Sequence, residues 1–139
     1  MKRFKFLEKE AIADYAILAE GDKISEAFEA AAEALFSLMF KNLDKVKCKK
    51  RIVIRESAKS KDLLLFRFLN DLVYLKDKDR LALAKFKVRL NKKSLICKCC
   101  GQKISKALEQ NIDVKGVTLH NLWIRRFNSK YRIHFVVDV

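Results

Sequence analysis

The chain has 139 residues, 50% of them hydrophobic, and is therefore long enough to bury the core of one domain. It contains no apolar run long enough to cross a bilayer. The charged first ten residues lack the apolar middle of a signal peptide. These properties argue against membrane and secreted proteins. We therefore expect one cytoplasmic domain over residues 1–139, whose four cysteines are thiols rather than disulfides.

Basic residues dominate the charge, since 31 Lys and Arg against 17 Asp and Glu give a formal net charge of +14. An excess of this size promotes encounter with polyanions such as RNA. Lysine enrichment is also typical of heat-adapted proteins, so charge alone does not identify a nucleic-acid interface.

The first third of the chain predicts two strands and a helix. Alternating side chains indicate a strand over residues 3–8. A second strand, over residues 14–20, is nearly apolar on both faces, as is typical inside a sheet. Apolar residues then recur at three- and four-residue steps over 24–40, which predicts an amphipathic helix. Asp22 or Ser25 is its expected N-cap.

The middle of the chain predicts a strand, a second helix and a hairpin. After a lysine-rich connection, β-branched residues with charged ends indicate a strand over 51–55. Ser60 is the expected N-cap of a helix over 62–76, whose mostly apolar circumference predicts extensive burial. A period of two indicates a strand over 81–90, and residues 95–100 are expected to return as its hairpin partner.

The last third leaves one segment open, because residues 105–110 fit either a helical turn or a loop. Residues 114–127 and 130–139 predict a final hairpin. Two helices and about seven strands, with hairpins dominating, predict an α+β fold in two layers. In this fold two main helices accompany a mostly antiparallel or mixed sheet.

The cysteines do not indicate a zinc site. A structural zinc site usually needs two separated ligand pairs, whereas Cys97, Cys99 and Cys100 are clustered and only Cys48 lies elsewhere. We instead expect Cys97 and Cys99 on one face of their strand, with Cys100 opposite.

The sequence also shows no catalytic constellation. With three glycines it has no phosphate-binding Gly-rich loop. Neither histidine lies beside a Ser or Cys nucleophile in a recognisable motif. Absence of a motif does not exclude catalysis, but nothing in these residues indicates it.

Several stretches together resemble the archease family. Archeases carry an Asp-His-Thr-Ala-Asp segment before a strand, then a Gly, then a helix with an acidic first turn. The matching positions are residues 10–14, Gly21 and E-A-F-E at 26–29. The order of these pieces is that of the family.

The resemblance continues to the other end of the chain. The family's Leu-rich second helix is similar to residues 64–74, and its Val-Lys-Ala-Val-Thr-x-His strand is similar to V-K-G-V-T-L-H at 114–120. Its C-terminal Asp followed by one aliphatic residue matches Asp138 and Val139. The pieces cover nearly the whole chain and imply the archease fold.

The chain also departs from the family. The first Asp, the His and the Thr of the family segment are Glu10, Ala11 and Ile12 here, and the usual acidic and His residues around Gly101 are absent or replaced. The resemblance is therefore to a divergent member, in which these positions do not carry the family's usual residues.

The resemblance implies an accessory protein, not an enzyme. Archeases act with a GTP-dependent tRNA-splicing ligase of the RtcB type, promote its guanylylation and allow multiple turnover. They bind a divalent cation, commonly calcium, at positions that correspond to Asp14, Asp138 and the terminal carboxylate of Val139. Calcium prefers oxygen ligands, and clustered carboxylates need a cation or a proton to offset their repulsion. On spacing alone, an isolated Asp at a strand end is more often a solvated or capping residue.

Glu10, Lys115 and His120 are further candidates for contacts with a partner or with the ligands. A lysine can contact a phosphate or an acid, and a histidine can ligate a metal or donate a hydrogen bond. The plain alternative is a surface lysine and a polar strand histidine, because alternation places Lys115 and His120 on opposite faces.

Two other functions remain open. A basic RNA-binding module that delivers tRNA without a metal would use Lys85, Lys87 and Arg89, together with Arg125 and Arg126. A steep loss of tRNA affinity with salt, without any effect of a chelator, would favour this module. A general chaperone would need an exposed apolar patch.

Overall fold

The computed structural model describes residues 1–7 and 14–139. Seven strands, two α-helices and one short 3-10 helix occur within these ranges. In chain order they are β1 (Arg3–Phe6), β2 (Asp14–Gly21), α1 (Ile24–Met39), η1 (Leu43–Lys45), β3 (Lys50–Ser57), α2 (Lys61–Lys78), β4 (Leu81–Leu90), β5 (Ser94–Lys103), β6 (Gly116–Phe127) and β7 (Lys130–Asp138).

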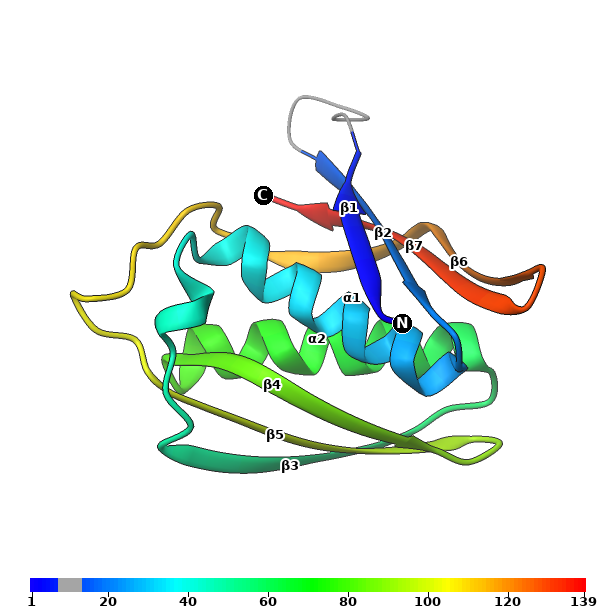
Figure 1. The fold of residues 1–139 in the computed structure, drawn as a ribbon, viewed down its shortest axis with the longest axis horizontal. Helices are drawn as coiled ribbons and strands as arrows, with labels where there is room; N and C mark the ends of the chain where they lie inside the picture. The colour runs from blue at the N-terminus through cyan, green and yellow to red at the C-terminus, as the bar shows by residue number, and fades with distance from the viewer. Residues whose placement is uncertain (8–13) are drawn as a thin grey trace.

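The strands form two antiparallel sheets, with both helices between them (Figure 1). One sheet has the order β1-β2-β7-β6, and the other has the order β3-β5-β4. Helix α1 contacts β2 and β4, and helix α2 contacts β6 and β3, so each helix packs on both sheets. The α+β class predicted from the sequence is confirmed. The expected two layers become three, because the strands divide into two sheets that cover opposite sides of the helix layer.

Helix α1 fills this middle layer with small residues. Five of its alanines and both of its phenylalanines have no exposed surface, and a helix with so many short side chains lets two sheets approach it closely. The predicted cap at Asp22 or Ser25 is wrong. Lys23 is the N-cap residue, and its backbone N–H donates to the Glu26 carboxylate at 3.1 Å. The Asp22 carboxylate instead accepts from the amino group of Met1.

Helix α2 begins as the sequence predicts. The Ser60 hydroxyl accepts a hydrogen bond from the backbone N–H of Leu63 at 3.2 Å, which satisfies one of the free donors at the helix start. The rings of Phe68 and Phe28 are stacked between the two helices, 6.2 Å apart. None of the helices in the described ranges is long and apolar enough to cross a membrane.

The connection between β5 and β6 is a loop with a turn, rather than a helix, at residues 105–110. The buried ammonium group of Lys76 on α2 fixes its end. This group donates to the Asp113 carboxylate at 3.0 Å and to the backbone oxygen of Val114 at 3.1 Å. The start of β6 is therefore attached to the helix layer.

The cysteines only partly follow the expectation. Cys97 and Cys99 are free thiols and lie in the core, as expected for small residues on one strand face. Cys48 and Cys100 form a disulfide, with their α-carbons 5.0 Å apart. The expectation of four thiols is therefore wrong for this pair, because the lysine-rich segment before β3 runs close to the end of β5.

Candidate functional site

The start of β2 and the end of β7 lie side by side (Figure 1). The antiparallel register makes Asp14 and Asp138 direct partners. On its other side Asp138 is the partner of Gly116, the first residue of β6, and the backbone N–H of Lys115 donates to the Asp138 backbone oxygen at 2.8 Å. The two segments that the sequence singled out, near the two ends of the chain, therefore meet at one edge of the sheet, where β2 begins and β7 ends.

The end of β7 determines which residues are available at this edge. The five residues before Asp138 are all buried, and Asp138, the last residue of the strand, is exposed. Val139 is half-buried and packs against the core, which holds the last residue of the chain near the sheet. No residue in the described part of the chain forms an ion pair with Asp138.

A side chain that the sequence analysis did not single out holds β6 at this edge. Asn70 of α2 donates to the backbone oxygen of Val117 at 3.1 Å and accepts from its N–H at 2.9 Å. An amide side chain can replace a neighbouring strand in this way, since it offers one donor and one acceptor. The signal in the sequence is weak, because Asn70 is one of three polar residues, with Arg67 and Asp71, that interrupt the apolar run of this helix.

The predicted metal ligands remain a prediction. Among the side chains that the structure describes, those of residues 1–7 and 15–139, no group of three from His, Cys, Asp or Glu is arranged to hold a metal ion. The register supports the pairing of Asp14 with Asp138 at the level of the backbone. Glu10 lies outside the described residues.

Lys115 and His120 occupy different settings. Lys115 is exposed and directly precedes β6, next to Asp138. His120 is exposed in a part of β6 where the register with β7 shifts, and its ring nitrogen Nε2 lies 3.1 Å from Nδ2 of Asn121. Asn121 has a positive φ of 56°, so simple alternation does not carry through this irregularity.

Comparisons with known proteins show the family to which this chain belongs. The model of the Archease protein family (MTH1598/TM1083) matches residues 4–139. The chain belongs to the archease family. It is 35% identical to the protein archease of Sulfolobus acidocaldarius over 142 residues, which cover 100% of both chains.

Two solved structures share the archease fold with this chain. The solution structure of protein 1598 from Methanobacterium thermoautotrophicum has a TM-score of 0.86 and 25% identity, and the match covers 98% of each chain. The crystal structure of an archease from Thermotoga maritima, described as a possible chaperone, has a TM-score of 0.65 and 18% identity over 94% of each chain. The order of helices and strands expected from the archease resemblance is therefore confirmed.

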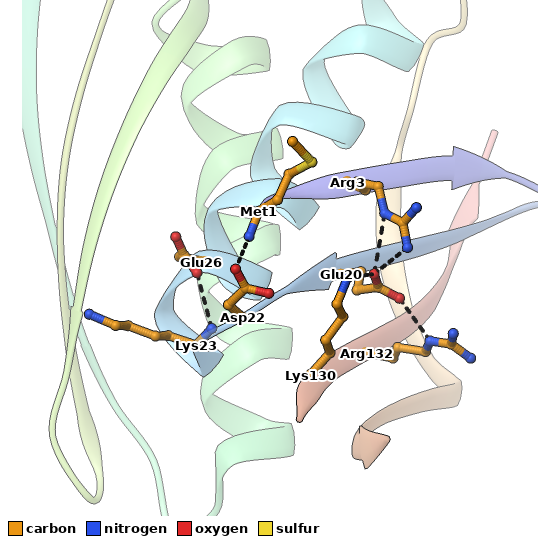
Figure 2. Close-up of polar contacts among 8 residues, drawn as sticks. All are labelled: Met1, Arg3, Glu20, Asp22, Lys23, Glu26, Lys130 and Arg132. Atoms are coloured by element: carbon orange, nitrogen blue, oxygen red, sulfur yellow. Dashed lines mark hydrogen bonds and ion pairs between the residues drawn. The ribbon is translucent and has the colours of Figure 1, made fainter. Parts of the chain in front are cut away.

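The far end of β2 carries a second cluster of charges that the sequence analysis missed. Figure 2 shows Arg3 of β1 and Lys130 and Arg132 of β7 converging on the buried Glu20 of β2. The nearest nitrogens of these three residues lie 2.5, 3.5 and 2.9 Å from the carboxylate. The hydrogen bonds from Arg3 and Arg132 lower the pKa of Glu20 to about 2.

This second cluster joins three strands of the sheet. It lies at the end of β2 opposite to Asp14, and its carboxylate is already satisfied by the cations around it. We therefore assign it to the stability of the sheet, not to ligand binding. Its parts come from both ends of the chain, so no local sequence pattern signals it.

The five basic residues considered for RNA binding do not form one surface. Lys85, Lys87 and Arg89 are on β4, whereas Arg125 and Arg126 are on β6, in the other sheet. The helix layer separates the two groups (Figure 1). A basic surface of this protein must therefore be defined on each sheet separately.

Proposed function

We propose that this archease is a metal-binding accessory protein that activates an RtcB-type GTP-dependent tRNA-splicing RNA ligase. In this role it promotes guanylylation of the ligase and allows multiple turnover, and it carries out no reaction itself. Family membership and the resemblance of its motifs support the role. The observation that carries the metal-binding part is the direct pairing of Asp14 with Asp138 in the register of β2 and β7.

The donors at this edge fit a hard divalent cation, most simply calcium. Asp14, Asp138 and the terminal carboxylate of Val139 would supply oxygen ligands, which calcium prefers over nitrogen and sulfur. Carboxylates this close repel each other unless a cation or a proton compensates them. The exposed Asp138 has no compensating ion pair among the described residues.

A site with few protein ligands leaves coordination positions for a partner. Calcium accepts six to eight oxygens, more than three carboxylates are expected to provide. A ligase residue or a nucleotide phosphate would complete the shell. Lys115, exposed and adjacent to Asp138, is placed to contact an acidic or phosphate group of that partner. Glu10 and His120 remain candidates for contacts with the partner.

A general chaperone role has less support. The large exposed apolar side chains of the described residues are scattered over the N-terminus, β1, β3, α2 and β6. Such single residues are normal on a soluble protein and do not form a binding patch.

Calcium titration by calorimetry tests the site. We expect the Asp138→Asn variant to lose calcium binding and the Asp44→Asn variant to keep it, because Asp44 is exposed on η1, which contacts β4 of the other sheet. Equal calcium affinity in both variants would rule out the site. The function is tested by ligation with the cognate ligase, with and without this protein. Product that does not exceed one equivalent of ligase in its presence would contradict the proposal.

A further inference from the structure

The outer face of the three-stranded sheet carries a dense group of cations. The β3-β5-β4 register places Arg51 level with Lys85, Arg55 level with Arg89, and Lys98 beside Lys87. All six are exposed. The remaining positions of this face are uncharged: Val53, Ser57, Ser94, Ile96 and Cys100. We call the six basic residues the cationic face.

The cationic face lacks compensating acids. None of the six cations takes part in an ion pair among the described residues. By contrast, three cations of the other sheet share the Glu20 carboxylate. The cationic face is thus free to meet an external anion.

This arrangement works against the stability of the isolated protein. Lys87 and Lys98 are direct partners on adjacent strands, and like charges in that relation destabilise a sheet. The hydrophobic core does not depend on these lysines, because the opposite face of the same strands supplies the core residues Phe86, Val88 and Cys97. The repulsion would be relieved by a bound polyanion.

The dimensions indicate what kind of polyanion fits. Neighbouring strands are about 4.8 Å apart and alternate residues of one strand about 7 Å apart, so the six charges occupy a patch of about 10 by 14 Å. Double-helical nucleic acid carries roughly one charge per 1.7 Å of its axis. A duplex lying along the patch therefore carries about eight phosphates on its two strands over this length, the same order as the six cations of the face.

The composition of the face argues for a duplex over a single strand. Sites for single strands combine basic residues with aromatic side chains on which the bases stack. The cationic face has no aromatic residue, and its exposed apolar side chain is Val53. The geometry points to contact with phosphates, without access to the bases.

We propose that the cationic face binds the backbone of double-helical RNA independently of sequence. Only the choice of RNA over DNA rests on the proposed function, which places this protein with an RNA ligase. Binding itself needs neither the ligase nor the metal.

A labelled RNA hairpin with a stem of about 12 base pairs, followed by fluorescence anisotropy in EDTA without ligase, tests the proposal. The test variant, Arg55→Gln with Lys87→Gln and Lys98→Gln, removes one cation from each strand. We expect at least a tenfold loss of affinity and a log–log salt slope smaller by nearly three, because each phosphate contact contributes about 0.9. The control is Lys41→Gln with Lys45→Gln and Lys106→Gln, which changes the net charge equally at exposed positions outside the strands.

The control variant is expected to keep most of the affinity. The melting temperature of the test variant should not fall, since the change removes the repulsion between Lys87 and Lys98. A second variant, Arg51→Gln with Lys85→Gln, leaves the central strand unchanged and should also weaken binding.

Three results would overturn the proposal. Equal loss of affinity in the test and control variants would show that binding depends on net charge alone and not on the cationic face. Tighter binding of single-stranded RNA of the same length would show that bases are contacted, and tighter binding of a DNA duplex would overturn the choice of RNA. Failure of ligase activation, by contrast, would leave RNA binding in EDTA unaffected, so the two proposals fail separately.

Discussion

The Glu29 carboxylate of α1 accepts a hydrogen bond from the backbone N–H of Val88 at 2.8 Å. Val88 is on β4, an edge strand of the three-stranded sheet, and Glu29 is buried. The hydrogen bond joins the helix layer to the sheet. It also satisfies one backbone N–H of the edge strand, and an exposed strand edge can otherwise pair with another chain.

Removing this acceptor is expected to destabilise the fold. Glu29→Ala leaves the Val88 N–H buried without a partner and should lower the free energy of unfolding by about 1–3 kcal/mol. Urea unfolding followed by circular dichroism measures the change. Glu29 and Glu33 both lie 3.3 Å from the ammonium nitrogen of Lys2. Glu33→Ala is therefore the control, because among the described residues no buried backbone N–H donates to Glu33. A loss of similar size in both variants would show that the Val88 bond is unimportant.

Glu20 should make stability fall in acid. Its folded pKa of about 2, caused chiefly by the hydrogen bonds from Arg3 and Arg132, lies below the ordinary 4.5. Its contribution is therefore fully present above pH 4.5 and is lost as the pH falls towards 2. We expect Glu20→Gln to cost about 1–3 kcal/mol at pH 7 and much less near pH 2. Denaturant unfolding at several pH values measures this, and a pH-independent difference would contradict it.

Asp71 should have the opposite effect. Burial and the hydrogen bond with Glu56 raise its pKa to about 7. The raised pKa contributes stability below the ordinary value of 3.8, and this contribution is lost as the pH rises through 7. Asp71→Asn is expected to stabilise the protein by about 1 kcal/mol at pH 8 relative to the wild type and to change little at pH 4. Thermal melting at both pH values tests this. Equal shifts in melting temperature at the two pH values would be inconsistent with the raised pKa of Asp71.

The disulfide between Cys48 and Cys100 should stabilise the oxidised protein. It closes a segment with a sequence separation of 52, and a loop of this length predicts about 2–4 kcal/mol. We expect Cys48→Ser to lower the free energy of unfolding by this amount without reductant and to match the wild type in excess dithiothreitol. Denaturant unfolding under the two conditions measures the difference, and a loss that persists in reductant would point to packing instead.

Much of the secondary structure follows from local sequence. The period of two predicts β4 with its observed bounds, Leu81–Leu90. Alternation separates the buried side from the basic side from Lys85 onwards, whereas Leu81 to Leu83 are all buried and the register shifts after Leu83. The cap at Ser60 was predictable because its hydroxyl acts within one turn. The cap of α1 was not, because the amino group of Met1 contacts Asp22 from a distant part of the chain.

The sequence by itself determined the approximate positions of the elements, the buried faces of the clearly periodic ones, and the motifs that indicate the archease family. Periodicity and capping act over a few residues, so they can be read along the chain. Only the tertiary structure decided that the strands divide into two sheets and that Cys48 meets Cys100. It also decided that Asp14 pairs with Asp138. These relations depend on strand order and register between distant segments, which are determined by packing of the whole core.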